Sequence, residues 1–124
     1  MKKLYSILIC TFLTLNCFAT DVENMFNVSW NSKYKELQLL EYTGDQSVKN
    51  LDIPGNFRFA GKIYRVTDVA DMTFSRSSYL ESVTLPSTVK KIGYSVFSDC
   101  KNLKSVTLPN SLSEIGSELF SGCI

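Results

Sequence analysis

The feature that most constrains this chain of 124 residues is a phrase that occurs twice in succession, at an offset of 23 residues. The phrase is L-x-x-V-x-L-P-x-x-V/L-x-x-I-G-x-x-x-F-x-x-C, and it begins at Leu80 and again at Leu103. A weaker copy reads V-x-x-L-x-I-P from Val48 and continues as V-x-x-V-x-x-x-x-F from Val66. Repeats of this length are typical of solenoids, in which each coil buries its apolar side chains only against neighbouring coils.

Each coil is predicted to contain one strand, a second short extended segment and a single helical or 3₁₀ turn. The strand L-x-x-V-x-L ends at proline, which has no amide hydrogen for the next ladder bond. Equivalent side chains of successive coils should then stack about 4.8 Å apart. The predicted ladders are Phe74, Phe97 and Phe120, and Cys100 and Cys123. We expect the two cysteines to be buried thiols, with a disulfide as the alternative.

The first coil contains an insertion. Twelve steps separate Pro54 from Val66, whereas three separate Pro86 from Val89. A short hairpin that turns at residues 60–61, which read Ala-Gly, accounts for the extra residues.

Residues 24–42 predict a second hairpin, because apolar and polar residues alternate on both sides of a turn at residues 31–32. We interpret this hairpin as an N-terminal cap, since the first coil of a solenoid needs a cover for its open face. Trp30, Tyr34 and Tyr42 are the large side chains expected to provide that cover.

The repeated phrase resembles the BspA-like class of bacterial leucine-rich repeats over about residues 48–124. Ala70 and Ser77 depart from it in the first coil, where glycine and cysteine are usual. The resemblance implies a mainly β, right-handed leucine-rich repeat solenoid. It also implies a secreted or surface protein that binds protein partners, such as extracellular-matrix or host surface proteins. In such proteins the outward strand positions are the usual docking surface. Here these positions, which we call the strand strip, are Glu81, Ser82, Thr84, Lys104, Ser105 and Thr107.

The N-terminus predicts export. Two lysines at positions 2 and 3 precede a mostly apolar stretch over residues 4–15, which is too short for a comfortable membrane span, and Cys17-Phe18-Ala19 offers a cleavage site. An uncut membrane anchor and lipid attachment at Cys17 are the alternatives, although Thr14-Leu15-Asn16 fits a lipidation site poorly.

The predicted domain organisation follows from these segments. Residues 1–19 are the signal peptide, 20–47 the hairpin cap and 48–124 the repeats. The repeats divide into a degenerate first coil (48–79), a second (80–102) and an incomplete third (103–124).

Composition argues against several functions. The sequence contains no histidine, so it cannot form the Ser-His or Cys-His pair of a nucleophilic enzyme. Thirteen Lys and Arg face twelve Asp and Glu, so bulk charge does not favour a nucleic-acid partner. We predict no catalytic, metal or cofactor site and a non-enzymatic, adhesion-type module.

Positions 23 apart also predict columns of opposite charge that fix the register between coils. The columns are Asp68, Lys91 and Glu114; Glu81 and Lys104; and Arg76 and Asp99.

No polar capping segment follows the third coil, so its apolar residues should remain partly exposed. Two explanations fit this: the chain is a fragment of a longer repeat protein, or two copies associate end to end. For the function itself, two alternatives to protein binding stay open. One is a structural spacer or fragment without its own ligand, and the other is a carbohydrate-binding module that uses exposed aromatic rings.

Overall fold

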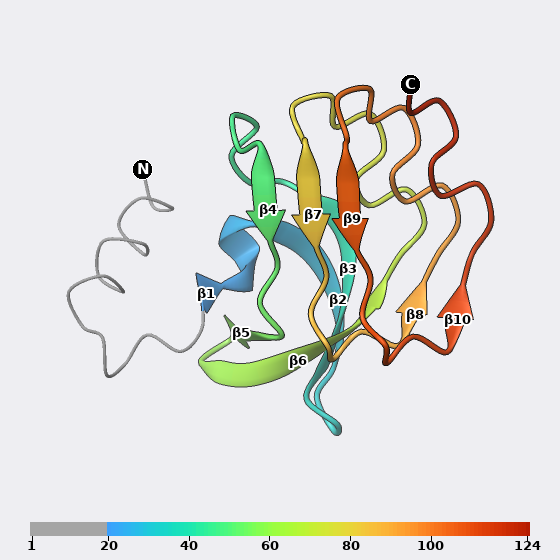
Figure 1. Ribbon diagram of the computed structural model, residues 1–124. Helices are drawn as coiled ribbons and strands as arrows, with labels where there is room; N and C mark the ends of the chain where they lie inside the picture. The colour runs from blue at the N-terminus through green and yellow to red at the C-terminus, as the bar shows by residue number, and fades with distance from the viewer. Residues whose placement is uncertain (1–19) are drawn as a thin grey trace.

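The computed structural model describes residues 20–124 (Figure 1). The predicted signal peptide and Cys17 lie outside this range. Two sheets enclose a common apolar core. The first sheet contains three parallel strands, β4 (Asn50–Asp52), β7 (Ser82–Thr84) and β9 (Ser105–Thr107), which lie side by side in Figure 1.

The second sheet is built on a long strand, β6 (Lys62–Val69), which pairs in parallel with β8 (Lys91–Ile92); β8 then pairs with β10 (Glu114–Ile115). β5 (Asn56–Phe59) pairs with β6 and with β1 (Thr20–Asp21). β3 (Glu36–Tyr42) pairs with β6 and with β2 (Phe26–Asn31). One 3₁₀ turn, η2 (Val22–Asn24), lies between β1 and β2. No helix among residues 20–124 is long and apolar enough to cross a membrane.

The register between coils confirms the solenoid. Val83 lies opposite Val106 in the first sheet, and Ile92 lies opposite Ile115 in the second, so residues 23 apart are neighbours. The phenylalanine rings stack in one file. The ring centroids of Phe74 and Phe97 are 5.5 Å apart with 3° between the planes, and those of Phe97 and Phe120 are 5.7 Å apart with 8° between the planes.

The segment that connects the two sheets, where a single helical or 3₁₀ turn was expected, is a series of tight turns without a continuous helix. The amide of Ser98 donates to the carbonyl of Ser95, and that of Cys100 donates to Phe97, which is a spacing of three residues in each case. Ser95 and Asp99 have positive φ angles of 52° and 57°, so the backbone leaves the helical region twice within five residues. These short reversals direct Phe97 into the core and still let the chain return from one sheet to the other.

Gly93 begins this connection because no side chain fits there. A Cβ atom on Gly93 would lie 2.1 Å from the Asp71 Oδ1 atom of the preceding coil. That carboxylate accepts a hydrogen bond of 2.9 Å from the amide of Tyr94. Glycine therefore lets the coils approach closely enough for this contact.

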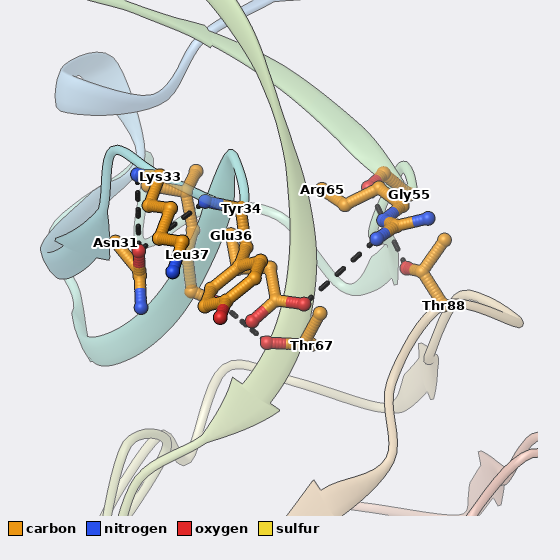
Figure 2. Close-up of polar contacts among 9 residues, drawn as sticks. All are labelled: Asn31, Lys33, Tyr34, Glu36, Leu37, Gly55, Arg65, Thr67 and Thr88. Carbon is orange, nitrogen blue, oxygen red and sulfur yellow. Dashed lines mark hydrogen bonds and ion pairs between the residues drawn. The ribbon is translucent and has the colours of Figure 1, made fainter.

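The N-terminal hairpin takes the place of a preceding coil. β2 and β3 are antiparallel, and the Asn31 Oδ1 atom at the turn accepts hydrogen bonds from the amides of Lys33 and Tyr34, at 3.1 and 3.3 Å (Figure 2). β3 pairs in parallel with β6. The amide of Ala70 donates to Leu39 at 2.8 Å, just as that of Gly93 donates to Val69. The solenoid ladder thus begins in the cap.

The side chains that fill the cap differ from those expected. Phe26, Leu37, Leu39 and Tyr42 are buried, and so is Val22 on η2. Trp30 and Tyr34 are 56% and 57% exposed, so their expected role as buried cover is wrong. Trp30 lies opposite the buried Leu37 but on β2, the edge strand of the sheet, and Tyr34 lies in the turn before β3.

The insertion in the first coil forms the predicted hairpin. β5 and β6 are antiparallel, and Ala60 and Gly61 between them have positive φ angles of 51° and 77°. Two left-handed residues in a two-residue loop are typical of a type I′ turn, which matches the twist of the flanking strands.

Candidate interaction surface

The strand strip lies on the outward face of the first sheet. Val83 points into the core and is 1% exposed, so Ser82 and Thr84 on either side of it point outward. Parallel pairing places Ser82 opposite Ser105, and Thr84 opposite Thr107. The centre of the strip therefore presents rows of small hydroxyl side chains.

The strip continues onto β4, which the sequence interpretation did not include. Asn50 lies opposite Ser82 and Asp52 opposite Thr84. The Ser82 hydroxyl donates a hydrogen bond of 2.7 Å to the Asn50 Oδ1 atom. These partners are 32 residues apart, because the insertion lengthens the first coil. Aligning the strands on their prolines would have found them.

A row of charges borders these hydroxyls at the start of the strands. The Glu81 carboxylate lies 2.9 Å from the Lys104 ammonium and 3.8 Å from that of Lys49. The hydrogen bond from Lys104 is the largest cause that holds the pKa of Glu81 below its usual range, and the positive charges of Lys104 and Lys49 act in the same direction. Glu81 is thus ionised and held between two exposed lysines at neutral pH.

Next to this row the surface is hollowed. The hollow has a volume of about 580 Å³ and contains one aromatic wall, Tyr79. Its lining residues are Ser47, Lys49, Tyr79, Glu81, Asn102 and Lys104. A partner on the strip could therefore place a side chain between the charged row and the Tyr79 ring.

Comparison with known proteins agrees with this geometry. A family model described as "BspA type Leucine rich repeat region (6 copies)" matches residues 67–124. This part of the chain is a BspA-type leucine-rich repeat region. A comparison with curated proteins gives no match.

Solved structures extend the similarity beyond residues 67–124. A leucine rich repeat protein of T. pallidum is 27% identical, with a TM-score of 0.64, over 78% of this chain and 42% of its own. A leucine rich cell surface protein of Faecalibacterium prausnitzii A2-165 is 31% identical, with a TM-score of 0.62, over 72% of this chain and 24% of its own. A leucine-rich repeat protein of Bacteroides ovatus, 19% identical over 80% of this chain and 32% of its own, shares the fold, with a TM-score of 0.66. The chain spans less than half the length of each of these proteins.

The cysteines of the BspA-type repeat are free thiols in the structure. Cys100 is fully buried, and burial is the main cause that raises its pKa to about 11. The Cys100 thiol donates to the carbonyl of Phe74, one coil earlier. Both the low thiolate content and the hydrogen bond indicate a structural role for this residue.

Two of the three charge columns contain ion pairs. Lys91 and Glu114 lie 3.6 Å apart, and Asp68 lies opposite Lys91 across the ladder. Glu81 and Lys104 form the second pair. Among residues 20–124, Arg76 and Asp99 do not pair, because Asp99 faces the backbone of the next coil: a Cβ atom on Gly122 would lie 2.1 Å from the Asp99 Oδ1 atom.

The third coil of the BspA-type repeat exposes large apolar side chains. Phe120 is 44% exposed and Ile115 is 54% exposed, whereas their counterparts one coil earlier, Phe97 and Ile92, are buried. Phe97 and Ile92 are buried because the third coil packs on the second. End-to-end association through this face stays a prediction.

Within the described residues, no group of three or more His, Cys, Asp or Glu side chains could hold a metal ion. The strand strip offers small hydroxyls and paired charges, which suit recognition of another molecule's surface.

Proposed function

We propose that this chain is a non-enzymatic protein-binding module that acts outside the cell, with the strand strip as its docking surface. The observation that carries the proposal is the fixed arrangement of the strip: rows of Ser and Thr hydroxyls, bordered by Glu81 between two lysines. Small side chains let a partner approach the sheet closely, and the charged row provides orientation and specificity.

The size of the strip sets an expectation for affinity. Three strands at about 4.8 Å spacing are only ~10 Å across. A stable interface usually buries about 800 Å² on each partner. Contacts limited to this strip and its hollow should therefore give weak, reversible binding, which is compatible with adhesion through many copies on a surface.

Location at the cell surface is part of the proposal. The predicted signal peptide at residues 1–19 supports it, and so does the description of the F. prausnitzii relative as a cell surface protein. Extracellular-matrix or host surface proteins are the partners that the family resemblance suggests.

A binding panel tests the proposal. The protein is applied to immobilised extracellular-matrix proteins, and the variant Glu81→Arg with Lys104→Glu is compared with it. This exchange keeps a pair of opposite charges at 81 and 104 and reverses their order, so a folded variant that loses binding supports the strip. The matched control is Lys91→Glu with Glu114→Lys, which exchanges the pair on the opposite sheet.

The alternatives give different results in the same panel. A structural spacer binds nothing on it. Equal loss of binding in both exchanges, or retained binding in the strip variant, places the site elsewhere. The exposure of Trp30 favours a carbohydrate ligand as a second candidate, at a different place on the molecule.

A further inference from the structure

Three aromatic rings form a continuous row where the two hairpins meet. The centroids of Trp30 and Phe59 are 4.9 Å apart, and those of Phe59 and Tyr64 are 5.6 Å apart. Tyr64 is 4% exposed, so the row begins in the core, and it ends at Trp30, which is 56% exposed. The Trp30 indole is therefore held in place by Phe59, while about half of its surface stays exposed to solvent.

Lysines flank this row. The Lys35 ammonium lies 5.8 Å from the centroid of the Tyr64 ring. Lys62 lies directly opposite Phe59 in the β5–β6 ladder, and directly paired residues project from the same face of a sheet. Within residues 20–124, neither lysine forms an ion pair with a carboxylate. Neither ammonium is therefore held by a direct ion pair, although the Lys35 ammonium donates a hydrogen bond to the carbonyl of Ser32.

The adjoining turn of the β2–β3 hairpin contains another aromatic ring and another lysine. Lys33 lies over the ring of Tyr34, with its ammonium 5.1 Å from the ring centroid. Figure 2 shows both residues at the turn that Asn31 closes. Glu36, the nearest acidic residue along this strand, is paired with Arg65 at 3.8 Å.

We propose that Trp30, Phe59, Lys35 and Lys62 form a binding site for an anionic glycan, separate from the strand strip. A pyranose ring presents a flat face of weakly positive C–H groups, which the negative face of the indole attracts. Carboxylate or sulfate groups on the rim of the sugar would lie toward the two lysines. The combination of one flat ring face and two lysines without a direct ion pair fits such a sugar better than a neutral one.

Intrinsic fluorescence gives a direct readout, because Trp30 is the only tryptophan in the sequence. The protein is titrated with polygalacturonate, which carries carboxylates, and with heparin, which carries sulfates. We expect either or both to change the Trp30 emission, while neutral dextran leaves it unchanged. The two anionic probes distinguish carboxylate from sulfate recognition.

Variants then test the named residues. Lys35→Gln and Lys62→Gln should each weaken binding about two- to fivefold, the effect of one exposed charge interaction. Lys101→Gln, an exposed lysine on a turn of the repeats, is the matched control and should bind like the parent protein. Trp30→Ala should lose retention on an anionic-glycan column, and Trp30→Phe should recover part of it, because a flat ring is restored.

Several outcomes overturn the proposal: an emission that neither anionic glycan changes, an equal change with dextran, or an equal loss in Lys101→Gln. Binding to single-stranded oligothymidylate or to phosphatidylglycerol vesicles in place of the glycans also overturns it. The strip variant, Glu81→Arg with Lys104→Glu, should keep glycan binding, so failure of this proposal is distinct from failure of the protein-binding function.

Discussion

The thiol of Cys123 donates a hydrogen bond to the carbonyl oxygen of Phe97, with 2.9 Å between sulfur and oxygen. Cys100 makes the same contact with Phe74 at 3.0 Å, so each coil is joined to the previous one by a thiol next to the phenylalanine ladder. In the first coil the equivalent position is Ser77, which is also buried. All three coils therefore have a small side chain that can donate a hydrogen bond at this position, and we expect the donor, not the sulfur atom as such, to be the requirement.

Substitutions at Cys100 test this requirement. Cys100→Ser retains a donor and should stay close to the parent in stability. Cys100→Ala is close to Cys100→Ser in volume but has no donor, and should lower the free energy of unfolding by about 1 kcal/mol or more relative to Cys100→Ser. Urea unfolding measures both. Equal stability of the two variants would mean that packing alone explains the cysteine ladder.

The raised pKa of Cys100 predicts how stability depends on pH. Burial raises it to about 11, so the folded state favours the protonated thiol, whereas the unfolded chain ionises at a lower pH. The free energy of unfolding should therefore fall as the pH rises from about 9 toward 11. Burial also raises the pKa of Tyr42, to about 12, so Tyr42 should lower the free energy of unfolding further at higher pH.

Urea unfolding at about pH 8 and about pH 10 measures this loss of stability. Cys100→Ser should show a smaller loss over that interval, because it has no thiol to ionise. An identical pH dependence in the two proteins would contradict the assignment to Cys100. Iodoacetamide should likewise modify Cys100 slowly in the folded protein and quickly in urea.

The charge column on the second sheet predicts the effect of a reversal. Lys91 pairs with Glu114 at 3.6 Å and lies opposite Asp68, so Lys91→Glu would place three carboxylates in one row. We expect a loss of stability of about 0.5–1 kcal/mol at low salt, and a smaller loss at high salt. Thermal unfolding measures it, and Lys101→Glu serves as the exposed control. A change equal to that of the control would show that the column does not fix the register.

The exposed face of the third coil predicts weak self-association of this chain. Because Phe120 and Ile115 are about half exposed, two copies can bury apolar area by meeting at this face. Light scattering should show a mass that rises with concentration. Ile115→Lys should abolish the rise, and Ile63→Lys, which changes an equally exposed residue on the β5–β6 hairpin, should not. A monomer at all concentrations would contradict this expectation.

Periodicity predicted the parts of the fold that obey the repeat. Stacked coils bring equivalent residues together, so the phenylalanine ladder and the facing valines of β7 and β9 follow directly from an offset of 23 residues. The hairpin at residues 60–61 followed from the length of an insertion between two aligned positions.

The cap and the turns were harder to predict because neither is specified by the repeat. Phe26 is buried because it packs against Phe57 and Phe74, whereas Trp30 lies on the edge strand β2 and is exposed. The alternation of the two residues alone cannot show this difference. Likewise, positive φ at Ser95 and Asp99 leaves no signal in the residue types, since serine and aspartate are also common in helical turns. The residues of β4 in the strip were missed because the insertion changes their offset.

Chemical-shift mapping by NMR locates the docking surface residue by residue. The labelled protein is titrated with a matrix protein that binds it in the panel, and amide shifts are followed along the chain. We expect the largest changes at Asn50, Ser82 and Ser105 and at the charged row beside them. Changes confined to the second sheet or to the hairpin tips around Trp30 would contradict the strand strip as the docking surface.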